Sequence, residues 1–143
     1  MAVSLTPYLH FGTDARAALE FYRSIFGGET QLATFAAFGV SADPAEADLV
    51  MHGFLRTDSG LELMASDTPS HMTPPAGTSV SLSLSGFGVD EATLRGYWDK
   101  LREGAREIGA ELGPAPWGAS FGQLTDRFGV IWLVNIDPGE PQG

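Results

Sequence analysis

The stretch P-Y-L-H-F-G-T-D-A-R-A-A-L-E-F-Y-R-S-I-F-G-G, residues 7–28, decides the fold because the chain repeats its pattern later. The second copy is S-L-S-G-F-G-V-D-E-A-T-L-R-G-Y-W-D-K-L-R-E-G, residues 83–104, at a constant offset of 76. The aligned pairs are Phe11 with Phe87, Gly12 with Gly88, Asp14 with Asp90, Phe21 with Tyr97, Tyr22 with Trp98, Ile25 with Leu101 and Gly28 with Gly104. Each copy reads as a strand, an acidic helix start, an amphipathic helix and a glycine stop. Two such halves bring two equivalent sheets together, and the cleft between them is the expected place for a small molecule.

The composition indicates one globular domain of 143 residues, with 43% hydrophobic residues and no apolar segment long enough to span a membrane. The N-terminus M-A-V-S-L-T-P lacks the basic and apolar regions of a signal peptide. The chain contains no cysteine, which excludes disulfides, thiolate metal sites and thiol nucleophiles, and we expect a cytoplasmic protein. A formal charge of −10, without any cluster of Arg and Lys, argues against nucleic acid as a partner.

Hydrophobic periodicity predicts a βαβββ order in each half. In the first half, the predicted strands cover residues 4–11, 29–38, 49–56 and 61–65, with a helix over 15–26 that Thr13 or Asp14 caps and a hairpin across T-D-S-G. In the second half, the predicted strands cover 79–85, 105–112, 117–124 and 130–136, with a helix from Asp90 to about residue 103. The modules therefore span about 4–67 and 78–137 of a single domain, 1–143, joined by a proline-rich linker at about 68–77.

Two motifs carry a resemblance to a known family: F-Y-R-S-I-F-G-G, residues 21–28, and W-G-A-S-F-G-Q-L-T-D-R-F-G-V-I-W-L-V-N-I, residues 117–136. With the two βαβββ modules, they make the chain resemble the PhnB-like branch of the vicinal oxygen chelate superfamily of glyoxalases, bleomycin-resistance proteins and ring-cleaving dioxygenases. The resemblance covers roughly residues 5–136. It implies an α+β fold in which the modules form a curled mixed sheet, and a homodimer with a cavity in each curled sheet. Members of this branch are often named after a demethylubiquinone methyltransferase, but no glycine-rich loop for S-adenosylmethionine is visible in this sequence.

The same resemblance implies a divalent metal held by side chains from strands of both modules. Carried over to this chain, the four ligand positions fall near Pro7, on Glu62, in V-S-L-S and on or near Leu133. Since only Glu62 has a matching side chain, we expect the inherited site to be lost and no cofactor to be needed.

A different metal set is the alternative: His10, His52 and Glu62, two histidines and a carboxylate, would suit Fe(II), Mn(II) or Zn(II). The competing interpretation, which we prefer, is that His10 ends a strand, His52 is packed and hydrogen-bonded, and Glu62 faces solvent. We expect His71, beside prolines, to be an exposed loop residue.

Acidic residues near two turns are the next candidates. Asp67 closes the strand L-M-A-S-D and is interpreted either as an acid at the rim of a cavity, able to act as a base there, or as a cap for the following loop. Asp126, next to Arg127 in T-D-R-F-G, is expected to bond its own backbone and to stabilise the turn.

Aromatic side chains are the better-supported candidates for ligand contact. They comprise Trp117, Phe121, Phe128 and Trp132 in the last third, and Phe35, Phe38 and Phe54 in the first half. Core packing is the preferred role for Phe128 and Trp132. Trp117 and Phe121 alternate with small residues in W-G-A-S-F-G, so that a ligand can approach them, and ligand contact and core packing stay equally weighted for this pair.

Three functions remain open on these residues. The first is a protein that binds or sequesters a small apolar or aromatic molecule between the modules, with contacts from Trp117, Phe121, Phe54, His52 and Asp67. The second is a metal-dependent lyase, isomerase or dioxygenase in which Glu62 and one or both of His10 and His52 hold a divalent ion. The third is a protein that keeps the fold and a dimer for interaction alone. The missing ligands favour the first over the second, while fold alone does not fix chemistry.

Overall fold

The computed structural model describes residues 3–38, 44–70 and 80–139, which form two compact units, Met1–Gly77 and Thr78–Gly143. The first unit contains β1 (Tyr8–Phe11), α1 (Ala15–Phe26), β2 (Glu29–Thr34), two short 3-10 turns (Ala36–Phe38 and Pro44–Glu46), β3 (Val50–Arg56) and β4 (Glu62–Asp67). The second contains β5 (Leu82–Phe87), a 3-10 turn (Gly88–Asp90), α2 (Glu91–Arg102), β6 (Glu107–Pro114), β7 (Ser120–Thr125) and β8 (Ile131–Asp137). Each unit is therefore a βαβββ module, and the predicted α+β fold class is confirmed.

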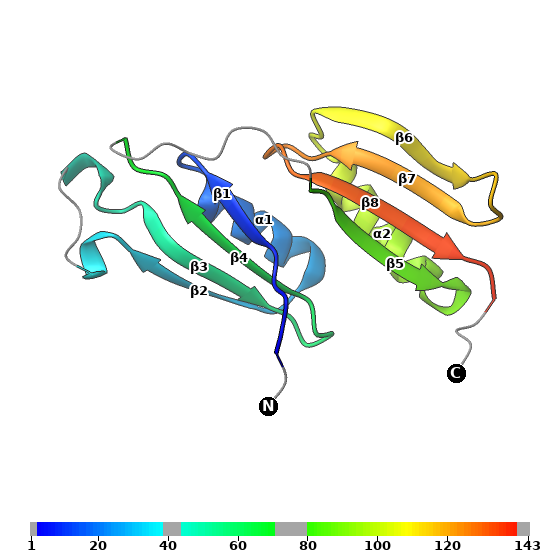
Figure 1. Ribbon diagram of the computed structural model, residues 1–143, viewed down its shortest axis with the longest axis horizontal. Coiled ribbons are helices and arrows are strands. Elements are labelled where there is room, and N and C mark those ends of the chain that lie inside the picture. Colours follow the sequence, from blue (N-terminus) through cyan, green and yellow to red (C-terminus); the bar gives the residue numbers. More distant parts are fainter. Residues whose placement is uncertain (1–2, 39–43, 71–79, 140–143) are drawn as a thin grey trace. The chain divides into compact units, whose positions relative to one another are not determined.

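The first sheet has the strand order β1-β4-β3-β2, in which β1 and β4 are parallel and the other neighbours antiparallel. Helix α1 covers one face of this sheet (Figure 1). Its side chains Ala18, Leu19, Tyr22 and Ile25 are buried, as their three- and four-residue spacing predicts. Gly53 of β3 lets the helix approach, because a Cβ there would lie 2.5 Å from the Leu19 side chain.

The second sheet repeats this arrangement in the order β5-β8-β7-β6, with β5 parallel to β8 (Figure 1). Helix α2 buries Leu94, Trp98 and Leu101 against it. Gly122 of β7 makes room for the Trp98 ring, since a Cβ at that position would lie 2.8 Å from it. The internal repeat predicted from residues 7–28 and 83–104 thus corresponds to two like-built sheet–helix layers.

Several strand ends differ from the predicted ones because turns override the apolar pattern. The strand predicted over 29–38 ends at Thr34, and Phe38 belongs to a 3-10 turn. Trp117, predicted to start a strand, lies instead in the β6–β7 turn, where Ala115 N–H donates to the Ala119 carbonyl at 2.8 Å. The hairpin across T-D-S-G is confirmed, with Gly60 at a φ of +96° that L-residues rarely adopt.

The cap of helix α1 also differs from the predicted one. Asp14 occupies the N-cap position, but its side chain makes no capping hydrogen bond. The acceptor comes instead from β4, where Asp67 Oδ1 accepts a hydrogen bond from Ala15 N–H at 2.8 Å. A residue 52 positions away in sequence therefore caps this helix, which no local capping pattern could indicate.

Among the residues that the structure describes, no helix is both long and apolar enough to cross a membrane. His71 and most of the linker predicted at 68–77 lie outside the described residues.

Candidate functional site

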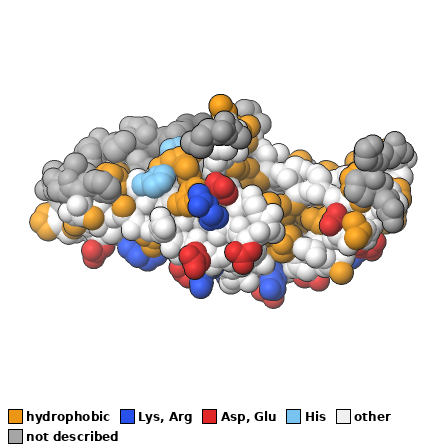
Figure 2. All heavy atoms as spheres, turned by 90° about the horizontal axis from the view of Figure 1, so that it is seen from below, with side chains coloured by type: hydrophobic (Ala, Val, Ile, Leu, Met, Phe, Trp, Pro, Cys, Tyr) orange, Lys and Arg blue, Asp and Glu red, His pale blue; other side chains and the backbone are white. Residues whose placement is uncertain are grey.

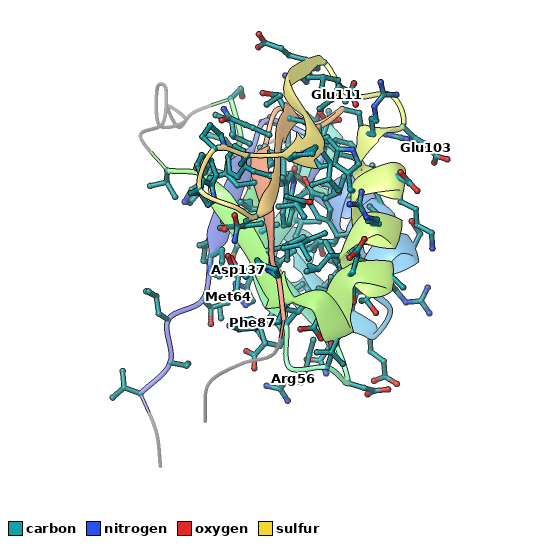
Figure 3. All side chains as sticks on the ribbon, turned by 90° about the vertical axis from the view of Figure 1, so that its right-hand side faces the viewer. Arg56, Met64, Phe87, Glu103, Glu111 and Asp137 are labelled. Carbon is teal, nitrogen blue, oxygen red and sulfur yellow. The ribbon has the colours of Figure 1, made fainter. Side chains whose placement is uncertain are left out.

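Each sheet has one face that its own helix does not cover, and the predicted site residues other than Asp67 divide between these two faces. We name the helix-free face of the first sheet the first face; burial alternates along β4, so Leu63, Ala65 and Asp67 point to α1. The side chains on the first face include Tyr8, His10, His52, Phe54, Arg56, Glu62, Met64 and Ser66. The side chain of Met64 lies on the side away from α1 (Figure 3).

A row of polar side chains crosses three strands of the first face. His10 lies opposite Ser66, and the distance from His10 Nδ1 to Ser66 Oγ is 3.5 Å. The Tyr8 hydroxyl is 3.2 Å from His52 Nδ1, and the Tyr8 ring stacks on His10 with 5.0 Å between ring centroids. Figure 2 shows pale-blue histidine side chains at the surface beside orange hydrophobic ones. The structure therefore brings His10 and His52 onto one face, with Tyr8 in contact with both.

Glu62 lies on the same face but at the other end of β4. It is four residues from Ser66, about 13 Å along a strand. Its carboxylate is 3.9 Å from the guanidinium of Arg56, which also lies over the Phe54 ring at 5.1 Å from the centroid. Glu62 and Phe54 are thus associated with an arginine and not with the histidines.

The second face, the helix-free side of the second sheet, carries Ser83, Ser85, Phe121, Gln123, Leu133 and Asn135. Trp117, from the β6–β7 turn, contacts this face. Its ring meets Phe121 edge-on at 5.3 Å between centroids, and its indole N–H donates to Asn135 Oδ1 at 3.3 Å. Trp117 is nevertheless 62% exposed, so an aromatic surface is held in place while open to solvent.

The two acidic residues near turns serve the backbone. Asp67 is buried, with Oδ1 bonded to Ala15 N–H and Oδ2 to Val50 N–H, both at 2.8 Å. It faces α1, away from the first face. Asp126 is fully buried and accepts hydrogen bonds from the backbone N–H groups of Phe128 and Val130 and from the Trp132 indole. Asp67 therefore holds elements together, whereas Asp126 bonds the backbone of its own turn, the role expected from the sequence.

Comparison with known proteins decides the family. A family model described as Glyoxalase/Bleomycin resistance protein/Dioxygenase superfamily matches residues 5–134. The chain belongs to this superfamily.

Relatives within the superfamily agree with the PhnB-like resemblance of the sequence. The chain is 28% identical to Protein YjdN of Escherichia coli K12, over 96% of this chain and 97% of that protein. It is 35% identical to protein PA1353 of Pseudomonas aeruginosa, with a TM-score of 0.78 over 96% of this chain and all of that structure. The PhnB protein of Bacillus cereus, named after a 3-demethylubiquinone-9 3-methyltransferase, shares the fold at 23% identity, with a TM-score of 0.71 over 94% of this chain and 99% of its own.

The divalent metal that superfamily membership implies does not fit the donors that this chain provides. The predicted set of His10, His52 and Glu62 is not brought together, because Glu62 lies about four residues along β4 from the histidine row and faces Arg56. Within residues 3–38, 44–70 and 80–139, no cluster of three or more His, Asp or Glu side chains could hold an ion. We therefore derive no step through a metal.

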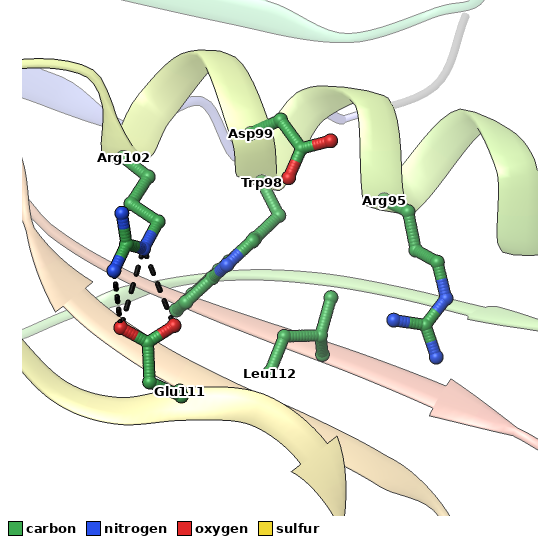
Figure 4. Close-up of a pocket in the computed structure, with 6 residues that line it drawn as sticks. All are labelled: Arg95, Trp98, Asp99, Arg102, Glu111 and Leu112. Carbon is green, nitrogen blue, oxygen red and sulfur yellow. Dashed lines mark hydrogen bonds and ion pairs between the residues drawn. The ribbon is translucent and has the colours of Figure 1, made fainter.

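A separate hollow of about 430 Å³ lies between α2 and β6, lined by Arg95, Trp98, Asp99, Arg102, Glu111 and Leu112 (Figure 4). Arg102 donates to both carboxylate oxygens of Glu111, the shortest contact being 2.6 Å. This hydrogen bonding lowers the pKa of Glu111 and raises that of Arg102. Since Arg102 pairs with Glu111 and Arg95 pairs with Glu91, we interpret the hollow as an exposed ion-pair surface and not as a candidate site.

Tyr8 and Asn135 contact predicted site residues on these faces but were not predicted as site residues themselves. Tyr8 precedes His10 by two positions and Asn135 precedes Asp137 by two, so strand alternation alone indicates that each shares a face with that neighbour. Their contacts with His52 and Trp117 depend on cross-strand register and on a turn, which alternation does not supply.

Proposed function

We propose that the chain binds a small apolar or aromatic molecule, and that the second face makes the main contact. The observation that carries the proposal is the exposed Trp117, held over Phe121 by an edge contact and by its hydrogen bond to Asn135. A pre-arranged aromatic pair next to a few polar groups is what a flat ligand needs, because little side-chain freedom is lost on binding.

The first face carries side chains of a similar kind and is the alternative location for the site. His52 and Phe54, predicted as ligand contacts, both lie there, together with Tyr8 and Met64. Aromatic and thioether side chains with one hydroxyl and two imidazoles also suit a flat molecule. Asp67 is left out of the proposal, since both of its oxygens are used by backbone N–H groups on the other side of the sheet.

Tryptophan emission gives a direct test, because Trp98 and Trp132 are only 3% and 2% exposed while Trp117 is 62% exposed. The uncharged dye N-phenyl-1-naphthylamine should bind saturably, with energy transfer from tryptophan to the dye. Replacing the indole in Trp117→Ala should weaken dye binding by about tenfold, the usual scale for loss of an aromatic contact residue.

Tyr8→Ala is the matched control on the first face. If the second face carries the binding, this variant should bind the dye within about twofold of the unmodified protein. Equal loss in Tyr8→Ala and none in Trp117→Ala would move the site to the first face. Absence of saturable binding to the unmodified protein would refute the proposal.

We also propose that the chain forms a homodimer and that it is located in the cytoplasm. Both stay predictions. Pairing is supported physically by the sheet edges β1, β2, β5 and β6, because edge strands present N–H and C=O groups that a second chain can use.

A further inference from the structure

We propose that the second face selects an uncharged aromatic ligand bearing a hydrogen-bond acceptor such as a carbonyl group, and that Asn135 is the residue that selects it. This inference rests on the proposed binding function and names the chemical class of the ligand. It follows from the direction of one hydrogen bond and from the register of three strands.

The orientation of the Asn135 side-chain amide is fixed by its partner. An indole N–H can only donate, so the Asn135 atom 3.3 Å from Trp117 Nε1 must be the oxygen. The amide nitrogen then points elsewhere with two N–H donors. Among the described residues, no hydrogen bond to this nitrogen is found. Asn135 therefore offers two N–H donors to whatever lies on the second face, while one lone pair of its oxygen is already used by the indole.

Register places further groups beside these donors. Ser85 on β5 and Phe121 on β7 lie directly opposite Asn135, on either side of it. Neighbouring strands are about 4.8 Å apart, so the row from Ser85 to Phe121 spans about 10 Å, the length of a one- or two-ring molecule. Ser85 shares a hydrogen bond with Ser83 at 3.2 Å, and between them the two hydroxyls keep one further hydrogen to donate.

The charges nearby disfavour an anion. Asp137 lies two residues beyond Asn135 on β8 and so on the same face, and the whole chain carries a formal charge of −10. A carboxylate ligand would be repelled by both, whereas a neutral carbonyl oxygen is not. A ring that stacks near Trp117 and Phe121, with a carbonyl oxygen toward Asn135 Nδ2, uses both aromatic side chains and the donors of Asn135.

The test compares acetophenone with ethylbenzene, which has the same ring and nearly the same shape but no acceptor. In ¹⁵N–¹H spectra of the unmodified protein, both probes should shift the Trp117 indole signal. Only acetophenone should shift the Asn135 side-chain amide signals. It should also bind at least about fivefold more tightly than ethylbenzene, which corresponds to the net contribution of one hydrogen bond.

Asn135→Asp keeps an oxygen for the Trp117 indole but removes both donors. Acetophenone binding should fall at least about fivefold in this variant, while ethylbenzene binding stays unchanged. Gln123→Glu is the matched control, because it makes the same amide-to-carboxylate change on the same face, away from Trp117.

The outcomes separate the two proposals. Equal binding of the two probes, without any shift of the Asn135 amide signals, overturns the selection by Asn135 and leaves aromatic binding intact. Equal losses in Asn135→Asp and Gln123→Glu would also overturn it, since charge alone would then be responsible. If neither probe shifts the Trp117 signal, both proposals fail.

Discussion

Asp67 is the residue whose role depends most on its distant partners. Its two carboxylate oxygens accept the N–H of Ala15, at the start of α1, and the N–H of Val50, at the start of β3. A negative charge at a helix N-terminus is favourable, and both N–H groups are out of reach of water in this buried place. One side chain of β4 thus fixes where two other elements begin.

Asp67→Ala should destabilise the protein by about 3 kcal/mol, because two buried N–H groups lose their acceptors. Asp67→Asn should cost roughly half as much, since its amide keeps one oxygen as acceptor. Urea denaturation followed by circular dichroism measures both values. Asp58→Ala, in the exposed turn before Gly60, should change the free energy of unfolding by less than about 0.5 kcal/mol. Similar effects of Asp67→Ala and Asp58→Ala would contradict the capping role.

At the scale of elements, α2 packs against β7 and forms an exposed ion pair with β6. Trp98 packs into the space left by Gly122, and Arg102 donates to Glu111 at the edge of the same layer. That hydrogen bonding lowers the pKa of Glu111. Because the pKa of Glu111 is lower in the folded state, the ion pair stabilises the folded protein at pH values above the ordinary glutamate pKa. This stabilisation is lost as the pH falls through the lowered pKa.

Arg102→Gln should therefore raise the pKa of Glu111 toward its ordinary value, as measured by ¹³C chemical shifts of its carboxyl group across an acid titration. Arg95→Gln is the control on the same helix, because Arg95 pairs with Glu91 and not with Glu111. A Glu111 titration midpoint that is the same in all three proteins would show that the ion pair does not form in solution.

On the scale of the whole molecule, each of the two sheets in the described part of the chain ends in two edge strands, β1 and β2 in the first and β5 and β6 in the second. Edge strands are a ready surface for pairing with another chain, and pairing into a closed dimer satisfies them without open-ended assembly. The predicted homodimer should give a mass of twice the 15.2 kDa of one chain in light scattering after size exclusion. The mass should stay constant on dilution through the micromolar range. A mass of one chain at every concentration would exclude the dimer.

The repeat of residues 7–28 in residues 83–104 indicated the two helices, and hydrophobic periodicity along each half indicated the βαβββ order and the α+β class. Such features follow from hydrophobic period and local turn chemistry, which are written in neighbouring residues. Residue type also sufficed to propose Trp117 and Phe121 as ligand contacts and Asp126 as a structural acid.

Only the tertiary structure decided which of these residues meet. The parallel register of β1 and β4 places His10 beside Ser66 and leaves Glu62 beside Arg56, and the β6–β7 turn brings Trp117 onto Asn135. The buried Asp67 caps a helix 52 residues away for the same reason. A sequence pattern with a period of two assigns a side chain to a face of a sheet, but its position along that face depends on long-range pairing.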